Sequence, residues 1–134
     1  MVYWADGKTY VAVVAGDGAI RAHLKRALGG VADEVATFPD DSALLPELDR
    51  IAAAERREGT QYRKVLIVQG ALDGADHGLT VARWARPFFD KVAVLGSRNR
   101  HWKDALGACR ADACLHVTGA PDLADRLSAM AATA

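Results

Sequence analysis

Acidic side chains that follow strand-like apolar runs are the first candidates for chemistry. Asp17 comes soon after the run that ends at Val14, and Asp73 and Asp76 come soon after the run that ends at Val68. Carboxylate oxygens are preferred ligands of Mg²⁺, and an aspartate can also accept a phosphoryl group. Asp-Gly and Asp-His-Gly are equally typical of turns in which the aspartate bonds to its own backbone, and we favour this turn interpretation.

A short glycine pattern, Gly16-Asp17-Gly18, suggests a second kind of site. It begins like the GxGxxG loop that places a phosphate at a helix N-terminus, but residue 21 is arginine where that loop has its third glycine. A tight turn into a helix is the simpler interpretation. If a small ligand did bind here, its site would comprise Gly16, Gly18, Gln69 and Ser97.

Cysteine and histidine residues in the C-terminal third suggest a metal site only weakly. Cys109, Cys114 and His116 have the spacing C-x4-C-x-H, which is not a common zinc pattern even with His101 added. The order of these residues also does not favour a hydrolytic triad. We therefore expect free thiols, no metal or other cofactor and no enzymatic activity.

The elements that must position these residues follow from the alternation of apolar runs and amphipathic stretches. Strands are expected near residues 10–14, 34–38, 64–68, 91–95 and 113–117, and helices near residues 19–28, 40–57, 79–86, 102–109 and from 121 onward. The second helix is expected to be capped by Asp40, Asp41 or Ser42. Strands alternating with helices predict a (βα)5 flavodoxin-like α/β fold, a three-layer sandwich around a five-stranded parallel sheet.

Length and composition fit one globular domain with no strong preference for a charged partner. The chain has 134 residues, 51% of them apolar, and 17 basic residues balance 17 acidic ones. Residues 1–8 lie outside the strand-helix pattern and are interpreted as an N-terminal extension, with one domain over residues 9–134. A zero net charge gives no reason to expect nucleic acid or membrane as the main partner. The start lacks the pattern of a signal peptide, and we expect a cytoplasmic protein.

Four segments together resemble one known family. VVAGDGAIRAHLKRAL, KVLIVQGALDGADHGL, VAVLGS and CLHVTGAPDLADRL begin at residues 13, 64, 92 and 114. In order and spacing they are similar to the first, third, fourth and fifth strands of response-regulator receiver domains, with the loops and helices that follow these strands. The resemblance covers about residues 10–130 and implies the receiver-like version of the fold.

The resemblance also implies that the phosphorylation site of the family is degenerate here. In the family, two adjacent acids after the first strand hold Mg²⁺, and an aspartate ending the third strand accepts the phosphoryl group. A threonine or serine after the fourth strand and a lysine after the fifth strand contact the phosphate. The corresponding positions of this chain are Ala15 and Gly16 with Asp17 beside them, Gln69, Gly96 or Ser97, and Val117.

These departures point to a pseudo-receiver, because a neutral glutamine amide is a poor nucleophile and cannot form an acyl phosphate. The expected function is a non-catalytic protein-protein interaction or regulatory module in bacterial-type signal transduction, not switched by aspartyl phosphorylation. One alternative is a small-molecule or nucleotide sensor that binds at the carboxyl ends of the strands. A second alternative is an active receiver that uses Asp17 and Asp73 in displaced roles.

A cluster of arginine and aromatic residues is the candidate partner interface. The family meets its partners around its fourth helix, fifth strand and fifth helix, and arginine and tryptophan are enriched at interface hot spots. The partner would be a signalling protein or a second copy of the chain. The residues at which we expect the interface are Arg98, Arg100, His101 and Trp102.

Overall fold

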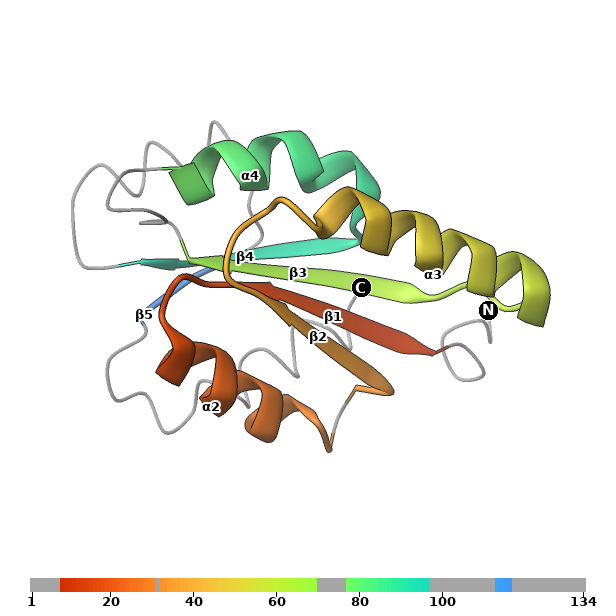
Figure 1. Cartoon of the computed structure of the whole chain (residues 1–134), viewed down its shortest axis with the longest axis horizontal. Helices are drawn as coiled ribbons and strands as arrows, with labels where there is room; N and C mark the ends of the chain where they lie inside the picture. The colour runs from red at the N-terminus through yellow and green to blue at the C-terminus, as the bar shows by residue number, and fades with distance from the viewer. Residues whose placement is uncertain (1–7, 31, 70–76, 97–112, 117–134) are drawn as a thin grey trace.

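The computed structural model describes residues 8–30, 32–69, 77–96 and 113–116, which form a parallel sheet with helices on both faces (Figure 1). In chain order the elements are β1 (Thr9–Val14), α2 (Gly18–Leu28), β2 (Glu34–Phe38), α3 (Leu44–Glu58), β3 (Arg63–Gln69), α4 (His77–Ala85), the 3₁₀ helix η2 (Arg86–Phe88), β4 (Lys91–Gly96) and β5 (Ala113–His116).

The strands lie in the order β2-β1-β3-β4-β5, and every neighbouring pair is parallel. In this register Val14, the last residue of β1, is paired with Phe38 on one side and with Val68 on the other. The connection from β1 leads to β2 on one side, and the connection from β3 leads to β4 on the other side, which makes the β1–β3 boundary the topological switch point. Ligands of open α/β sheets bind outside the carboxyl ends of the strands at such a point.

The central strand β1 is buried on both faces, which explains its unbroken apolar sequence. Val11 and Val13 pack with the buried residues of α2 on one face, while Tyr10 and Val14 pack with those of α3 and α4 on the other. Figure 1 shows α3 and α4 above the sheet and α2 below it. The two cores fix the face on which each helix lies, and thereby the loops at the carboxyl edge.

Helix α2 begins and ends where its flanking residues favour it. Asp17 has an extended backbone, and its Oδ1 accepts a hydrogen bond from the N–H of Ala19 at 2.8 Å, as an N-cap should. Leu24 and Leu28 are buried against the sheet. The helix ends at Gly29, whose N–H donates to the carbonyl of Lys25. The loop after β1 is therefore tied directly to the first turn of α2.

The strands and helices predicted before residue 97 are present, and their bounds differ by a few residues. The start of α3 differs from the prediction, because the cap expected at Asp40, Asp41 or Ser42 is wrong. Ala43 holds the N-cap position without a side-chain hydrogen bond. Asp40 Oδ1 instead accepts from the N–H of Ser42 at 2.9 Å, and the carbonyl of Asp41 accepts from the N–H of Leu44 at 3.1 Å. These polar residues close a turn that precedes the helix.

The helices predicted over 102–109 and from 121 lie outside the described residues, so the complete (βα)5 order stays a prediction. The division into an extension over residues 1–8 and one domain over 9–134 also stays a prediction. None of the helices in the described part of the chain has the length and apolarity needed to cross a membrane.

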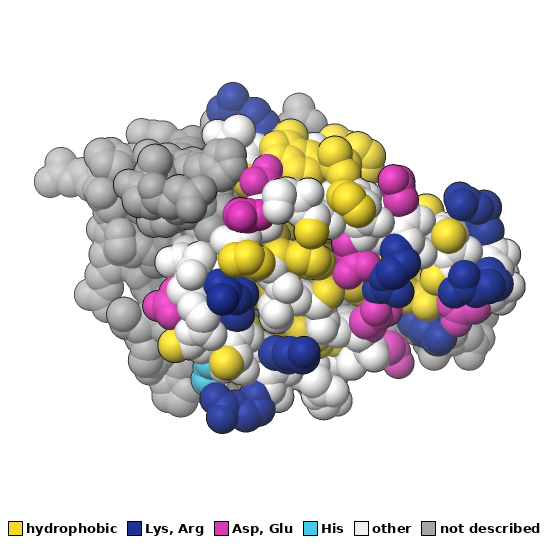
Figure 2. Space-filling model, in the orientation of Figure 1, with side chains coloured by type: hydrophobic (Ala, Val, Ile, Leu, Met, Phe, Trp, Pro, Cys, Tyr) yellow, Lys and Arg dark blue, Asp and Glu magenta, His cyan; other side chains and the backbone are white. Residues whose placement is uncertain are grey.

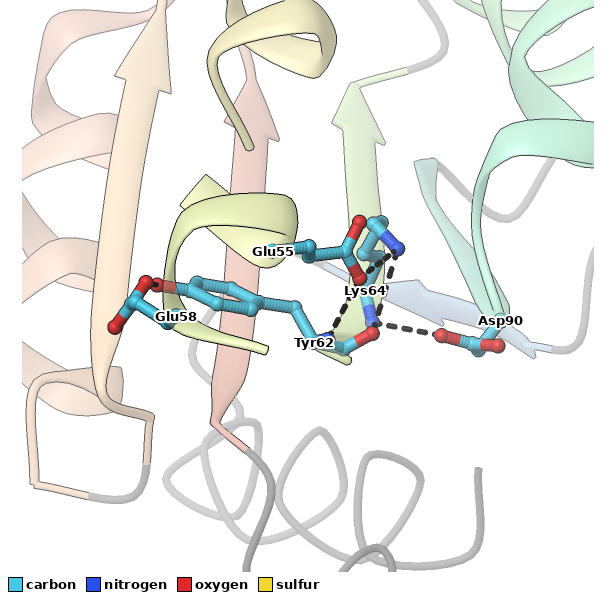
Figure 3. A network of polar contacts seen from close by, with 5 residues as sticks. All are labelled: Glu55, Glu58, Tyr62, Lys64 and Asp90. Carbon is cyan, nitrogen blue, oxygen red and sulfur yellow. Dashed lines mark hydrogen bonds and ion pairs between the residues drawn. The ribbon is translucent and has the colours of Figure 1, made fainter. Parts of the chain in front are cut away.

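A polar network joins the end of α3 to the starts of β3 and β4 (Figure 3). Glu55 Oε2 accepts from the N–H of Tyr62 at 2.8 Å and from Lys64 Nζ at 3.0 Å. The Tyr62 hydroxyl donates to Glu58 Oε2 at 2.6 Å, and the N–H of Lys64 donates to Asp90 Oδ2 at 2.8 Å. These contacts lie at the amino ends of the strands and hold the end of α3 against the sheet.

Candidate functional site

The candidate site lies where β1 and β3 end side by side. The side chain of Gln69, the last residue of β3, reaches the loop that follows β1. Its Oε1 accepts from the N–H of Gly16 at 2.9 Å and from the N–H of Asp17 at 3.3 Å. This neutral amide therefore serves as a hydrogen-bond acceptor for the loop.

Asp17, the carboxylate expected beside this site, is turned toward the helix. It caps Ala19, and its carbonyl accepts from the N–H of Arg21 at 3.1 Å. The residue is exposed, so its second carboxylate oxygen can be hydrated. Asp17 thus organises the first turn of α2.

Arg21 contacts the same loop through its side chain. Its Nη1 donates to the carbonyl of Ala15 at 2.6 Å. Its Nη2 would lie 3.3 Å from a Cβ added at Gly18, so the guanidinium folds back across the loop. The sequence marked Arg21 only as the residue that breaks a glycine pattern. Nothing in the spacing predicted this contact, since the path of a long side chain is not encoded in a motif.

Three of the described residues at this edge offer Mg²⁺ no carboxylate, which leaves Asp17 as the one acid of the β1–α2 loop. Ala15 is buried and carries no oxygen on its side chain, Gly16 has no side chain, and Gln69 offers a neutral oxygen that is already bonded. Mg²⁺ in proteins usually binds one or two carboxylates and retains several waters. Within the described ranges, no group of three or more His, Cys, Asp or Glu residues could hold a metal ion.

The remaining predicted site residues are placed only in part. Gly96 ends β4 next to the end of β3, since the preceding Leu95 is paired with Gln69. Cys114 and His116 lie on β5, where they are paired with Val94 and with Gly96. The predicted residues that lie outside the described part of the chain are Asp73, Asp76, Ser97, Arg98, Arg100, His101, Trp102, Cys109 and Val117.

Charges on the face shown in Figure 2 are mixed. Basic and acidic side chains are interspersed over α3 and its surroundings. Arg50, for example, contacts both Glu34 and Glu47. Basic side chains also gather lower in this view, over α2, whose last turn carries Lys25 and Arg26.

No protein-family model matches the chain, and no curated protein matches it significantly. Solved structures do match. A response regulator of Salmonella typhimurium, RcsB, has a TM-score of 0.70 at 19% identity, over 95% of this chain and 61% of that one. This chain thus spans less than two thirds of that protein.

Two further structures are matched over nearly their whole length. A response regulator from Thermotoga maritima has a TM-score of 0.69 at 18% identity, over 93% of this chain and 98% of that one. A pilus assembly-related protein from Burkholderia pseudomallei has a TM-score of 0.66 at 19% identity, over 94% and 91%. At these identities the likeness concerns the fold, and this chain has the α/β fold of response-regulator receiver domains.

Proposed function

We propose that this chain is a receiver-like signalling module that binds another protein and is not switched by aspartyl phosphorylation. The observation that carries the proposal is the role of Gln69. Its amide oxygen accepts hydrogen bonds from two backbone N–H groups of the β1–α2 loop. A neutral, hydrogen-bonded amide has no nucleophilic oxygen to offer a phosphoryl donor.

The fold neighbours support a signalling context, because several are response regulators. The proposed partner is a signalling protein in the cytoplasm or a second copy of this chain. Its proposed contact surface is the segment that contains Arg98, Arg100, His101 and Trp102. The interspersed charges over α3 in Figure 2 fit a protein partner better than a polyanion.

An amide NMR titration tests the absence of a phosphorylation switch. Mg²⁺ and then beryllium fluoride, a mimic of an aspartyl phosphate, are added to the ¹⁵N-labelled chain. We expect no saturable shifts at Gly16, Asp17, Gln69 or Gly96. Saturable shifts clustered at these amides would contradict the proposal and restore phosphorylation as the switch.

The interface is tested separately, with a partner captured by the wild-type chain. Arg100→Ala and Trp102→Ala are expected to weaken binding by about tenfold or more, as buried hot-spot residues do. Gln69→Ala serves as the control and is expected to leave the affinity nearly unchanged. Equal affinity of folded Arg100→Ala, Trp102→Ala and wild-type protein would remove this segment from the interface.

The alternative of a nucleotide or anion sensor at the same edge has less support from the geometry. The N–H groups of Gly16 and Asp17, which an anion would need, are already bonded to Gln69. Ligand binding to the folded state would raise the melting temperature. A set of nucleotides and cyclic nucleotides is therefore expected to leave the melting temperature unchanged.

A further inference from the structure

We infer that Arg21 provides a built-in positive charge at the carboxyl edge that takes the place of a divalent cation, holds the β1–α2 loop without metal and excludes Mg²⁺ from it. This inference rests on the proposed function, because it explains how the same edge is organised when phosphorylation chemistry is absent.

The loop is held from two sides by side chains. Arg21 Nη1 donates to the carbonyl of Ala15 at 2.6 Å. Gln69 Oε1 accepts from the N–H groups of Gly16 and Asp17. The carbonyl of Ala15 and the N–H groups of Gly16 and Asp17 thus all have partners within the protein, although Gly16 and Asp17 are exposed. A metal ion or bound anion is not needed to order this loop.

The charge of Arg21 matters as well as its hydrogen bond. A guanidinium carries a full positive charge spread over a planar group. Arg21 is half-buried, and among the described residues no carboxylate forms an ion pair with it. Like charges a few ångströms apart repel strongly where water is partly excluded. Restoring carboxylates alone should therefore not restore a Mg²⁺ site.

The test restores the missing acids and then removes the arginine. The starting protein is the double variant Gly16→Asp/Gln69→Asp, and the test protein adds Arg21→Met. The matched control adds Lys25→Met instead, which removes the same charge from an exposed position one turn further along α2. Mg²⁺ affinity is measured by calorimetry, and Mn²⁺ is used to broaden nearby amide signals in NMR spectra.

We expect removal of Arg21 to tighten Mg²⁺ binding by roughly tenfold or more, whereas Lys25→Met should change it by about twofold at most, because it is exposed and screened. Equal affinity with and without Arg21 would overturn the inference. So would the absence of Mg²⁺ binding in the Arg21→Met protein.

A second variant covers the case in which Arg21→Met does not fold. Arg21→Lys keeps the positive charge but replaces the planar group that reaches Ala15. In the same double-variant background it is expected to exclude Mg²⁺ as arginine does. Tight Mg²⁺ binding by a folded Arg21→Lys protein would also overturn the inference. Failure of the proposed function is distinguishable, since it appears as Mg²⁺ and beryllium fluoride binding by the wild-type chain itself.

Discussion

Tyr10 offers the sharpest prediction about stability. It is fully buried in β1, and its hydroxyl forms no hydrogen bond of normal geometry among the described residues, although the carboxylate of Glu47 lies near enough to raise its pKa. Glu47 Oε1 is engaged by Arg50, which draws this carboxylate away from ideal hydrogen-bond geometry with Tyr10. An unsatisfied buried polar group costs about 1–3 kcal/mol. Tyr10→Phe removes that hydroxyl and keeps the ring, so it is expected to raise the free energy of unfolding by about 1 kcal/mol at neutral pH.

The same residue predicts a dependence on alkaline pH. Burial, followed by the negative charge of Glu47, raises the pKa of Tyr10 far above its ordinary value of 10.0. Above pH 10 the unfolded chain loses this proton while the folded chain keeps it, so the unfolded state binds fewer protons. The stability that the folded state gains by retaining the proton of Tyr10 is complete below the pKa of this residue in the unfolded chain. It is lost as pH rises, at about 1.4 kcal/mol per pH unit above pH 10.

Urea unfolding from pH 7 to pH 11 measures both effects. The difference between Tyr10→Phe and the wild type should stay constant to about pH 10 and widen above it. Tyr62→Phe is the matched control, because the Tyr62 hydroxyl donates to Glu58 at 2.6 Å and its loss should destabilise the protein. If Tyr10→Phe destabilises the protein as Tyr62→Phe does, the Tyr10 hydroxyl has a partner and the reasoning is refuted.

Two further predictions concern the core beneath α3 and the network at its end. Ile51→Ala removes a fully buried side chain and should lower the free energy of unfolding, measured by chemical denaturation, by about 2–5 kcal/mol. The control Leu45→Ala changes a side chain that is 54% exposed, and it should alter this free energy by less than about 0.5 kcal/mol. The pKa of Glu58 is lowered by hydrogen bonds, first from Lys8 and then from Tyr62. Tyr62→Phe should therefore raise the pKa of Glu58, as measured by a ¹³C NMR titration. A carboxylate with a lowered pKa stabilises the protein above its unfolded pKa, and this stabilisation is lost as pH falls, so in the variant the decline should begin at a higher pH. An unchanged Glu58 pKa would contradict this hydrogen bond.

The central strands could be predicted from the sequence because burial on both faces leaves a simple pattern. The segments at 10–14 and 64–68 are continuous apolar runs, and both became buried parallel strands of nearly those bounds. The start of α3 was less predictable. Three polar residues could each have capped it, but Asp40 and Asp41 close a turn of their own, and the helix begins after that turn. Competition between local hydrogen bonds decides such boundaries.

The candidate site was predictable in its location and not in its contacts. The ends of the strands indicated that Gly16 and Gln69 would meet, since parallel strands place their carboxyl ends at one edge. The hydrogen bond between them joins residues 53 positions apart in the chain and depends on the rotamer of a long side chain. The position of the Arg21 guanidinium over the loop depends on its rotamer in the same way. Residue spacing predicts which backbones become neighbours, whereas the tertiary structure decides where long polar side chains point.

The two unpredicted contacts have a common physical consequence. Loss of the acids from a metal-binding loop would leave its backbone groups to water, and the loop would become less ordered. Here Arg21 binds the carbonyl of Ala15, and Gln69 binds the N–H groups of Gly16 and Asp17. Since the loop is ordered by the chain's own side chains, its conformation should not respond to metal or phosphate. Under the proposed function, regulation would therefore come from the partner's availability rather than from a switch within this chain.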